Sequence, residues 1–166
     1  MASINNTSYI VSGSDDKTIK IWNYKSGALW KTLTGHNASV KSVASISNTE
    51  YIVSGSDDKT IKIWNYASGN LTNTLIGHSN SVTSVASIAN TDYIVSGSND
   101  STIKIWNYKT GTLIRTVKEE SNCLASIANT INFVSGSRDS VMIYEFQKFE
   151  DINGTINNTI NYSDWI

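Results

Sequence analysis

The sequence predicts an all-β chain of tandem repeats, on the strength of its period and its strand pattern. Tryptophans at 22, 64 and 106 are spaced by 42 residues, and the segment Tyr51–Tyr66 (YIVSGSDDKTIKIWNY) returns almost unchanged at Tyr9–Tyr24 and Tyr93–Tyr108. A fixed period in this range is typical of repeat architectures. Short alternating runs, separated by turns rich in Gly, Asn, Asp and Ser, indicate four strands per period, and no helical periodicity competes.

The first repeat covers residues 1–34 and the second covers residues 35–76, which begin with Gly35-His36. The first is expected to open near the end of a strand, at Ala2-Ser3-Ile4. Its further strands are expected at Tyr9–Ser14, Thr18–Tyr24 and Ala28–Leu33. The strands of the second repeat are expected at Ser39–Ile46 (with an irregularity between Val40 and Val43), Tyr51–Ser56, Thr60–Tyr66 and Asn70–Ile76.

The third repeat, residues 77–118, copies the second, whereas residues 119–166 form a degenerate fourth copy. There Phe133 opens a second strand, and Val141–Phe146 forms a third with Tyr144 in the place of tryptophan. A longer loop containing Lys148, Glu150 and Asp151 is expected next. The fourth strand is then expected at 153–160.

Composition and charge exclude several classes of protein. The chain of 166 residues has a net charge of −1, which gives no basic surface for nucleic acid or an anionic membrane. Its single cysteine, Cys123, excludes an intramolecular disulfide and fits a reducing compartment. The sequence shows no signal peptide and no apolar run long enough to span a membrane, so a cytoplasmic location is expected.

Three motifs at this spacing resemble the WD-repeat family of β-propellers: Gly-His, Ser-Gly-Ser-x-Asp and Ile-x-Ile-Trp-Asn. The resemblance covers nearly the whole chain, although Trp-Asn stands where the family has Trp-Asp. It implies a single domain, residues 1–166, of about four blades, each a four-stranded antiparallel sheet with its first strand innermost.

The resemblance also implies a structural hydrogen-bond network of His, Ser, Asp and Trp inside each blade. Its members would be His36, Ser54, Asp58 and Trp64 in the second repeat, His78, Ser96, Asp100 and Trp106 in the third, and Ser12, Asp16 and Trp22 in the first. The fourth repeat would keep Ser135 and Asp139, with Glu120 and Tyr144 in the other places. Buried carboxylates and indoles need such partners.

A catalytic or metal-binding interpretation of these residues is disfavoured. The Ser-His-Asp set recurs in successive repeats, whereas a catalytic site is normally singular, and nothing supplies an oxyanion hole. Each complete repeat has one His, without a Cys or His partner at the spacing of metal ligands. We therefore expect no enzyme activity, no cofactor and no metal, and we expect Cys123 to pack in the core.

Function is expected at the positions that differ between repeats, through a non-catalytic scaffold for a protein or peptide partner. The family implies a binding face at the turn before each Asp and at the innermost strand. The candidate residues are Asp15, Ser39, Lys41, Asp57, Ser81, Thr83, Asn99 and Arg138. One alternative is a structural, self-assembling fragment, and a weaker one is the recognition domain of a larger signalling enzyme. Trp30 is either a contact site or packing at the blade edge.

The number of blades leaves three arrangements open. Four blades are few for a closed ring of this family, and an open arc exposes a sheet face at each end. The chain could be part of a longer propeller, or it could pair with a second copy into an eight-bladed ring. It could also close alone, with Ser163–Ile166 supplying the inner strand that the first repeat lacks.

Overall fold

Sixteen strands form four antiparallel sheets in the part of the chain that the structure, a computed structural model, describes. It describes residues 1–119, 123–127, 130, 132–137, 141–150 and 156–165. For residues 146–150 and 156–165 it describes the backbone alone. Within each sheet the strands follow chain order, so every connection joins antiparallel neighbours. The predicted all-β fold of four-stranded antiparallel sheets is therefore confirmed.

The strand bounds follow the 42-residue period through the first three sheets. The first sheet contains β1 (Ala2–Ser3), β2 (Tyr9–Gly13), β3 (Ile19–Asn23) and β4 (Leu29–Leu33). The second contains β5 (Val40–Ser45), β6 (Tyr51–Ser56), β7 (Thr60–Asn65) and β8 (Leu71–Ile76). The third contains β9 (Val82–Ser87), β10 (Tyr93–Ser98), β11 (Thr102–Asn107) and β12 (Leu113–Lys118). The fourth contains β13 (Cys123–Ser126), β14 (Phe133–Gly136), β15 (Val141–Glu150) and β16 (Ile156–Trp165).

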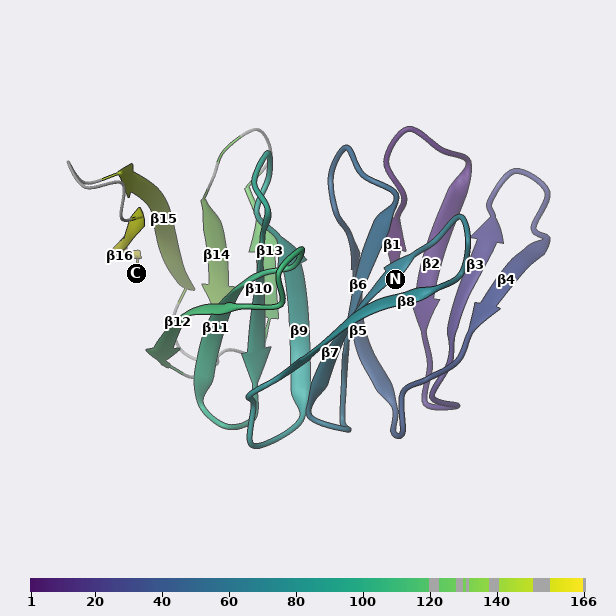
Figure 1. The fold of residues 1–166 in the computed structure, drawn as a ribbon, viewed down its shortest axis with the longest axis horizontal. Coiled ribbons are helices and arrows are strands. Elements are labelled where there is room, and N and C mark those ends of the chain that lie inside the picture. Colours follow the sequence, from purple (N-terminus) through teal and green to yellow (C-terminus); the bar gives the residue numbers. More distant parts are fainter. Residues whose placement is uncertain (120–122, 128–129, 131, 138–140, 151–155, 166) are drawn as a thin grey trace.

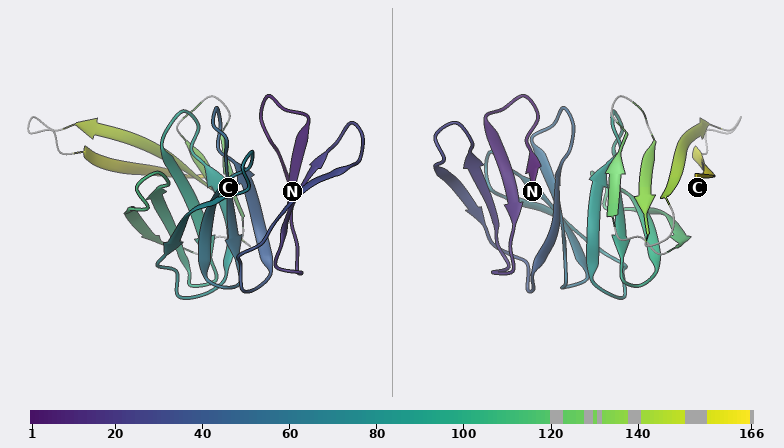
Figure 2. Two further views of the ribbon diagram at one scale, coloured as in Figure 1. Left: turned by 45° about the vertical axis from the view of Figure 1, so that its right-hand side comes forward. Right: turned by 180° about the vertical axis from the view of Figure 1, so that it is seen from behind.

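The four sheets stand side by side in chain order (Figure 1). Their first strands contact one another in sequence, β1 with β5, β5 with β9 and β9 with β13. The first and fourth sheets lie at opposite ends of this array in the further views of Figure 2. The described residues thus form an open array rather than a closed ring.

Three apolar clusters join the sheets in pairs, and both faces of the two middle sheets are buried. On β7, Ile61 and Ile63 pack toward the third sheet, whereas Trp64 packs toward the first. All three side chains are at most 1% exposed. A strand that alternates between two apolar environments carries few polar positions, which explains why the repeat motif is so rich in Ile, Val and Trp.

A bulge at the start of the innermost strands bends them, and a glycine opposite lets the next sheet approach. The pairing of β5 with β6 shifts register between Val40 and Ser42, as predicted, and β9 shifts in the same way. A Cβ atom on Gly55 would lie 2.6 Å from Cγ1 of Val82 and 3.0 Å from Cγ1 of Val85. Only glycine fits at this contact between neighbouring sheets.

The fourth sheet corrects the expected course of the C-terminal segment. Strand β15 runs from Val141 to Glu150, so Lys148 and Glu150 lie in a strand and not in a loop, while Asp151 falls outside the described residues. Its partner β16 begins at Ile156 and ends at Trp165, later than predicted. Ten residues of β15 pair with ten of β16, which gives this segment backbone hydrogen bonds that a loop at the same place would lack.

The arrangement in which the chain closes on itself is wrong for the same reason. Ser163 pairs with Ile143 and Trp165 pairs with Val141, so this segment is the outer strand of the fourth sheet and not an inner strand of the first. Ile166, the last residue of the proposed closing strand, is not among the described residues.

The prediction that Cys123 packs in the core is also wrong, because Cys123 is exposed. No helix among the described residues is long and apolar enough to cross a membrane.

Gly55→Ala should lower the free energy of unfolding by about 1–3 kcal/mol, because the new methyl group overlaps Val82. Urea denaturation monitored by tryptophan fluorescence measures this change. Adding Val82→Ala should make the Gly55→Ala change less costly than it is in the parent chain. Strictly additive effects of the two substitutions would argue against the contact.

Candidate functional site

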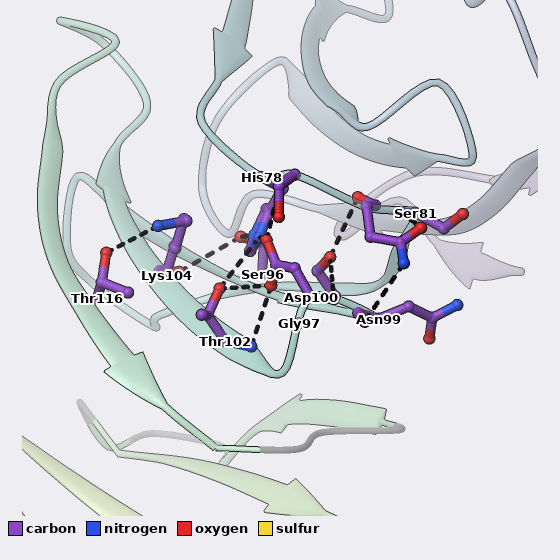
Figure 3. A network of polar contacts seen from close by, with 12 residues as sticks. His78, Ser81, Ser96, Gly97, Asn99, Asp100, Thr102, Lys104 and Thr116 are labelled. Carbon is purple, nitrogen blue, oxygen red and sulfur yellow. Dashed lines mark hydrogen bonds and ion pairs between the residues drawn. The ribbon is translucent and has the colours of Figure 1, made fainter.

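The second and third sheets each contain a buried chain of polar contacts. In the third sheet, the Nε1–H of Trp106 donates to Oγ of Ser96 over 2.9 Å. Oγ of Ser96 lies 2.8 Å from Nε2 of His78, whose Nδ1 lies 2.8 Å from Oδ2 of Asp100 (Figure 3). The second sheet repeats these contacts among the four equivalent residues, with the same spacing, namely His36, Ser54, Asp58 and Trp64.

Burial sets the protonation of this chain. Burial lowers the pKa of His36 and His78 below 6.5 and outweighs the opposing hydrogen bonds with the two Asp side chains. Burial also acts to raise the pKa of Asp58, but hydrogen bonds from Thr60, the Asn37 amide and His36 outweigh it and lower the pKa to about 2. The pKa of Asp100 is lowered to about 2 in the same way. At neutral pH the imidazoles of His36 and His78 are therefore neutral, and Asp58 and Asp100 are carboxylates.

This protonation orders the hydrogen bonds in one direction. The Nδ1–H of His36 donates to Asp58, which leaves Nε2 as the acceptor for the hydroxyl of Ser54. The same hydroxyl oxygen accepts the indole N–H of Trp64. Each buried polar atom named here has a partner, so burial of the chain leaves no donor unsatisfied.

The carboxylate at the end of the chain holds the turn between β6 and β7. Oδ1 of Asp58 accepts from the amide and the hydroxyl of Thr60, and Oδ2 accepts from the amide of Asn37. Lys59 between them has φ of 70°, a left-handed conformation that a residue with a side chain rarely adopts. The core thus fixes the turn. Asp57 beside it is half-buried at the rim, whereas Asn99 at the equivalent position is exposed.

The first sheet keeps only part of this chain. Trp22 donates to Oγ of Ser12 over 3.0 Å, as in the other sheets. Asp16 accepts from Thr18, but its second oxygen forms an ion pair with Lys20 at 3.0 Å, and its side chain is 46% exposed. In the other two sheets the equivalent lysines instead donate to threonine on the outer strand, Lys62 to Thr74 and Lys104 to Thr116.

The fourth sheet departs furthest from the pattern. Ser135 is 2% exposed and Tyr144 is fully buried, stacked on Phe133 at 4.8 Å. The hydroxyl of Tyr144 finds no hydrogen-bond partner within the described part of the chain. Glu120, Asp139 and the candidate rim residue Arg138 lie outside the described residues.

Four of the candidate partner-binding residues form one polar cluster across the first and second sheets. Nζ of Lys41 lies 3.0 Å from Oδ1 of Asp15 and 3.3 Å from Oδ2 of Asp57. Hydrogen bonds from Lys41 and Ser39 lower the pKa of Asp15, and the hydrogen bonds that Lys41 donates to Asp15 and Asp57 raise the pKa of Lys41. Lys41 lies at the bulge of β5, which turns its side chain toward the rim.

The corresponding positions of the third sheet are uncharged. Thr83 lies at the bulge of β9 and donates to the carbonyl of Gly97. Asn80 donates its side-chain amide to the carbonyl of Asn99, and its Oδ1 accepts from the amide of Ser81. Asn80 belongs to this rim but was not anticipated from the sequence, because the other repeat has Ala38 in its place.

Two further features appear only in three dimensions. Trp30 stacks on Tyr9 at 4.5 Å and meets the ring edge of Tyr66 at 6.5 Å, so it packs between the first and second sheets while staying 41% exposed.

At the opposite rim, a hollow of about 360 Å³ between the second and third sheets is bordered by Tyr51, Tyr108 and the Asp92–Lys109 ion pair. The sequence signals only the aromatic residues and not their meeting.

The described residues contain no group of three or more His, Cys, Asp or Glu side chains that could hold a metal ion. His36 and His78 have both ring nitrogens engaged within their own sheet. Hydrogen bonds thus connect a buried tryptophan to the turn at the rim.

Asp58→Ala should lower the free energy of unfolding by about 2–4 kcal/mol. The substitution removes the acceptor of the hydrogen bonds from His36, Thr60 and the Asn37 amide. Asp16→Ala is the matched control, since its carboxylate is half-exposed and has no imidazole partner. Thermal and urea denaturation compare the two variants. Equal losses would show that the imidazole contact contributes nothing.

Acidification should destabilise the protein in two steps. His36, His78, Asp58 and Asp100 all have lowered pKa values, so the unfolded chain binds more protons than the folded one. Stability is therefore fully present above about pH 6.5, falls as the unfolded histidines take up protons, and falls again below about pH 4 as the unfolded carboxyls do.

Melting temperatures between about pH 7.5 and about pH 5 test the histidine step. The double variant His36→Gln/His78→Gln should lose most of this slope. A melting temperature that rises on acidification across this range would contradict the assignment of neutral imidazoles.

Comparison with known proteins identifies the repeat. A family model described as "WD domain, G-beta repeat" matches residues 1–23, 27–65 and 69–107, more than half of the chain. The fourth sheet lies outside these ranges. Nuclear distribution protein nudF of Aspergillus flavus and that of Aspergillus oryzae are each 56% identical over 36 residues, which cover 22% of this chain and 8% of each relative. The matched stretch is about the length of a single repeat, so the chain covers less than a tenth of the length of these curated relatives. The period, the four-stranded sheets and the family match together show that the chain belongs to the WD-repeat family.

Proposed function

We propose that the protein is a non-catalytic platform that binds a protein or peptide partner on the rim formed by the β2–β3, β6–β7 and β10–β11 turns and by the first strands beside them. WD-repeat domains are generally protein-interaction scaffolds. The observation that carries the proposal is the anchoring of the rim turns. A buried carboxylate in each complete repeat ties the turn to the core. The residue before it is half-buried in the second sheet and exposed in the third.

Rigidity of the rim supports this proposal, because a surface that is already ordered loses little conformational entropy on binding. Lys41 adds a second restraint, since its ammonium group joins the turns of two neighbouring sheets through Asp15 and Asp57. The same two ion pairs are exposed and can be exchanged for contacts to a partner at small cost.

The composition of the rim favours a polar partner segment. Its charged part, around Lys41, lies on the first and second sheets, and its uncharged part, around Thr83 and Asn99, lies on the third. Large aromatic anchors are absent from the rim residues named here. A partner would therefore be recognised through hydrogen bonds and charge pairs spread along the rim.

Assembly is a second proposed function, favoured by the uncovered faces of the first and fourth sheets. Val141 is 49% exposed, whereas Ile103 at the equivalent position of the third sheet is 0% exposed. Tyr24 is 55% exposed, whereas Tyr66 is half-buried and Tyr108 is 3% exposed. The rim and the end faces are different surfaces, so binding and assembly are compatible.

Peptide-display selection on the immobilised protein, followed by calorimetry, tests the platform. Lys41→Ala/Asp57→Ala should weaken the selected peptides by at least about tenfold, because it removes charged contacts on the rim. The matched control is Lys109→Ala/Asp92→Ala, which removes an exposed ion pair of 2.8 Å from the opposite rim. Peptides that tolerate the first double variant and lose affinity with the second would place binding on the other rim and refute the proposal.

A further inference from the structure

Each sheet inside the array has two different faces. The forward face, which packs on the next sheet along the chain, carries Val53, Ile61, Ile63 and Leu75 in the second sheet. The backward face, which packs on the preceding sheet, carries Val82, Val85, Ile94 and Trp106 in the third sheet. Each contact between sheets joins a forward face rich in Val and Ile to a backward face with large buried rings, namely Trp64, Trp106, or Phe133 with Tyr144. The forward faces also contribute one tyrosine each, Tyr9, Tyr51 or Tyr93.

The first sheet leaves its backward face uncovered. Ile10 and Trp22 stand one period before Ile52 and Trp64, and they are half-buried where the later residues are 0% and 1% exposed. Tyr24 stands two periods before Tyr108 and is 55% exposed, against 3% for Tyr108. This face has the residue types of a buried backward face and lacks only its counterpart.

No described residue covers the forward face of the fourth sheet. Val134 and Ile143 are half-buried, and Val141 is 49% exposed. The equivalent residues of the third sheet, Val95, Ile105 and Ile103, are fully buried at 0%. One end of the array thus presents a backward face and the other end presents a forward face. Faces of these two kinds already pack against each other at three places within the chain.

A polar contact also has its counterparts at the two ends. Between the second and third sheets, the hydroxyl of Ser87 donates to the carbonyl of Ser45 over 3.0 Å. In the repeat register, Ser126 of the fourth sheet stands in the place of Ser45, and Ser3 of the first sheet stands in the place of Ser87. Both Ser3 and Ser126 are exposed.

We propose that the forward face of the fourth sheet packs on the backward face of the first sheet of a second copy of this chain, and that two copies close into one ring of eight blades. Ile10, Trp22 and Tyr24 of each copy would cover Val134, Val141 and Ile143 of the other. The hydroxyl of Ser3 would donate to the carbonyl of Ser126 across each junction.

Two copies fit the geometry of such rings. A contact between unlike faces closes only if the rotation between subunits brings the last face back to the first. Propellers have about four to eight blades, so two copies of four reach the upper end of this range and three copies exceed it. The net charge of −1 per chain opposes association only weakly.

Light scattering after size-exclusion chromatography measures the assembly directly. The parent chain should show twice the mass of one chain, which is 18.2 kDa. Val141→Lys should shift the mass to that of one chain without loss of β-sheet circular dichroism, because this side chain is already half-exposed in a single copy. Ile76→Lys is the matched control, since Ile76 is 77% exposed but lies on β8 of the second sheet, and it should leave the double mass unchanged.

Cross-linking tests the register of the two copies. Ser3→Cys/Ser126→Cys in a Cys123→Ser background should give a dimer with a short bis-maleimide, in high yield and at low protein concentration. Ser26→Cys/Ser126→Cys is the control, because Ser26 lies in the exposed turn between β3 and β4, away from the proposed junction. The expected yield of the control is at least about tenfold lower, as for chance encounters between unassociated chains.

A parent chain that keeps the mass of one chain across the concentration range overturns the proposal, and the end faces would then be covered by other repeats. Masses that grow beyond two chains, with a ladder of cross-linked products, would also overturn it in favour of an open filament. These outcomes concern the end faces alone and leave peptide binding at the rim to its own test.

Discussion

Every sheet of this protein is apolar on both faces, and the rest of the structure depends on that constraint. Ile61 and Ile63 on one face and Trp64 on the other can all be buried only when a sheet is enclosed between two others. The glycine at position 55, the bulges of β5 and β9 and the short turns all serve close stacking of neighbouring sheets. The same constraint makes the ends of the array its most consequential surfaces.

The polar chain from Trp to Asp connects this apolar packing to the surface. Trp64 and Trp106 are packed between sheets, and each donates a hydrogen bond to a serine. The serine contacts a histidine, and the histidine contacts a carboxylate in the turn. A buried polar chain of this kind is favourable only when every member is satisfied, so it selects one conformation of the turn. The first sheet, without a histidine at this place, turns Asp16 toward Lys20 instead. The anchoring of the rim turns through a histidine is therefore restricted to the second and third sheets among the described residues.

Much of the fold and of the polar chain could be anticipated from the repeats alone. A motif that returns every 42 residues must return to the same environment, so the strands of the first three sheets lie close to their predicted bounds. The strands of the fourth repeat were harder to predict, because its sequence departs from the repeat motif. Nothing in its residues distinguished a loop at 148–151 from the continuation of β15, since pairing with β16 is a long-range interaction. Cys123 was misplaced because Leu124 beside it is buried, whereas Cys123 itself is exposed.

The sequence by itself determined the strands, the turns and the residues of the polar chain, because these depend on local alternation and on the identity of equivalent positions. The tertiary structure decided which rim residues meet. The pairing of Lys41 with Asp15 and Asp57 joins two sheets across a bulge, and a pattern within one repeat carries no information on that meeting. It also decided that the array stays open and which face each end presents. That outcome depends on the stacking direction of whole sheets, a property of their packing and not of any single strand.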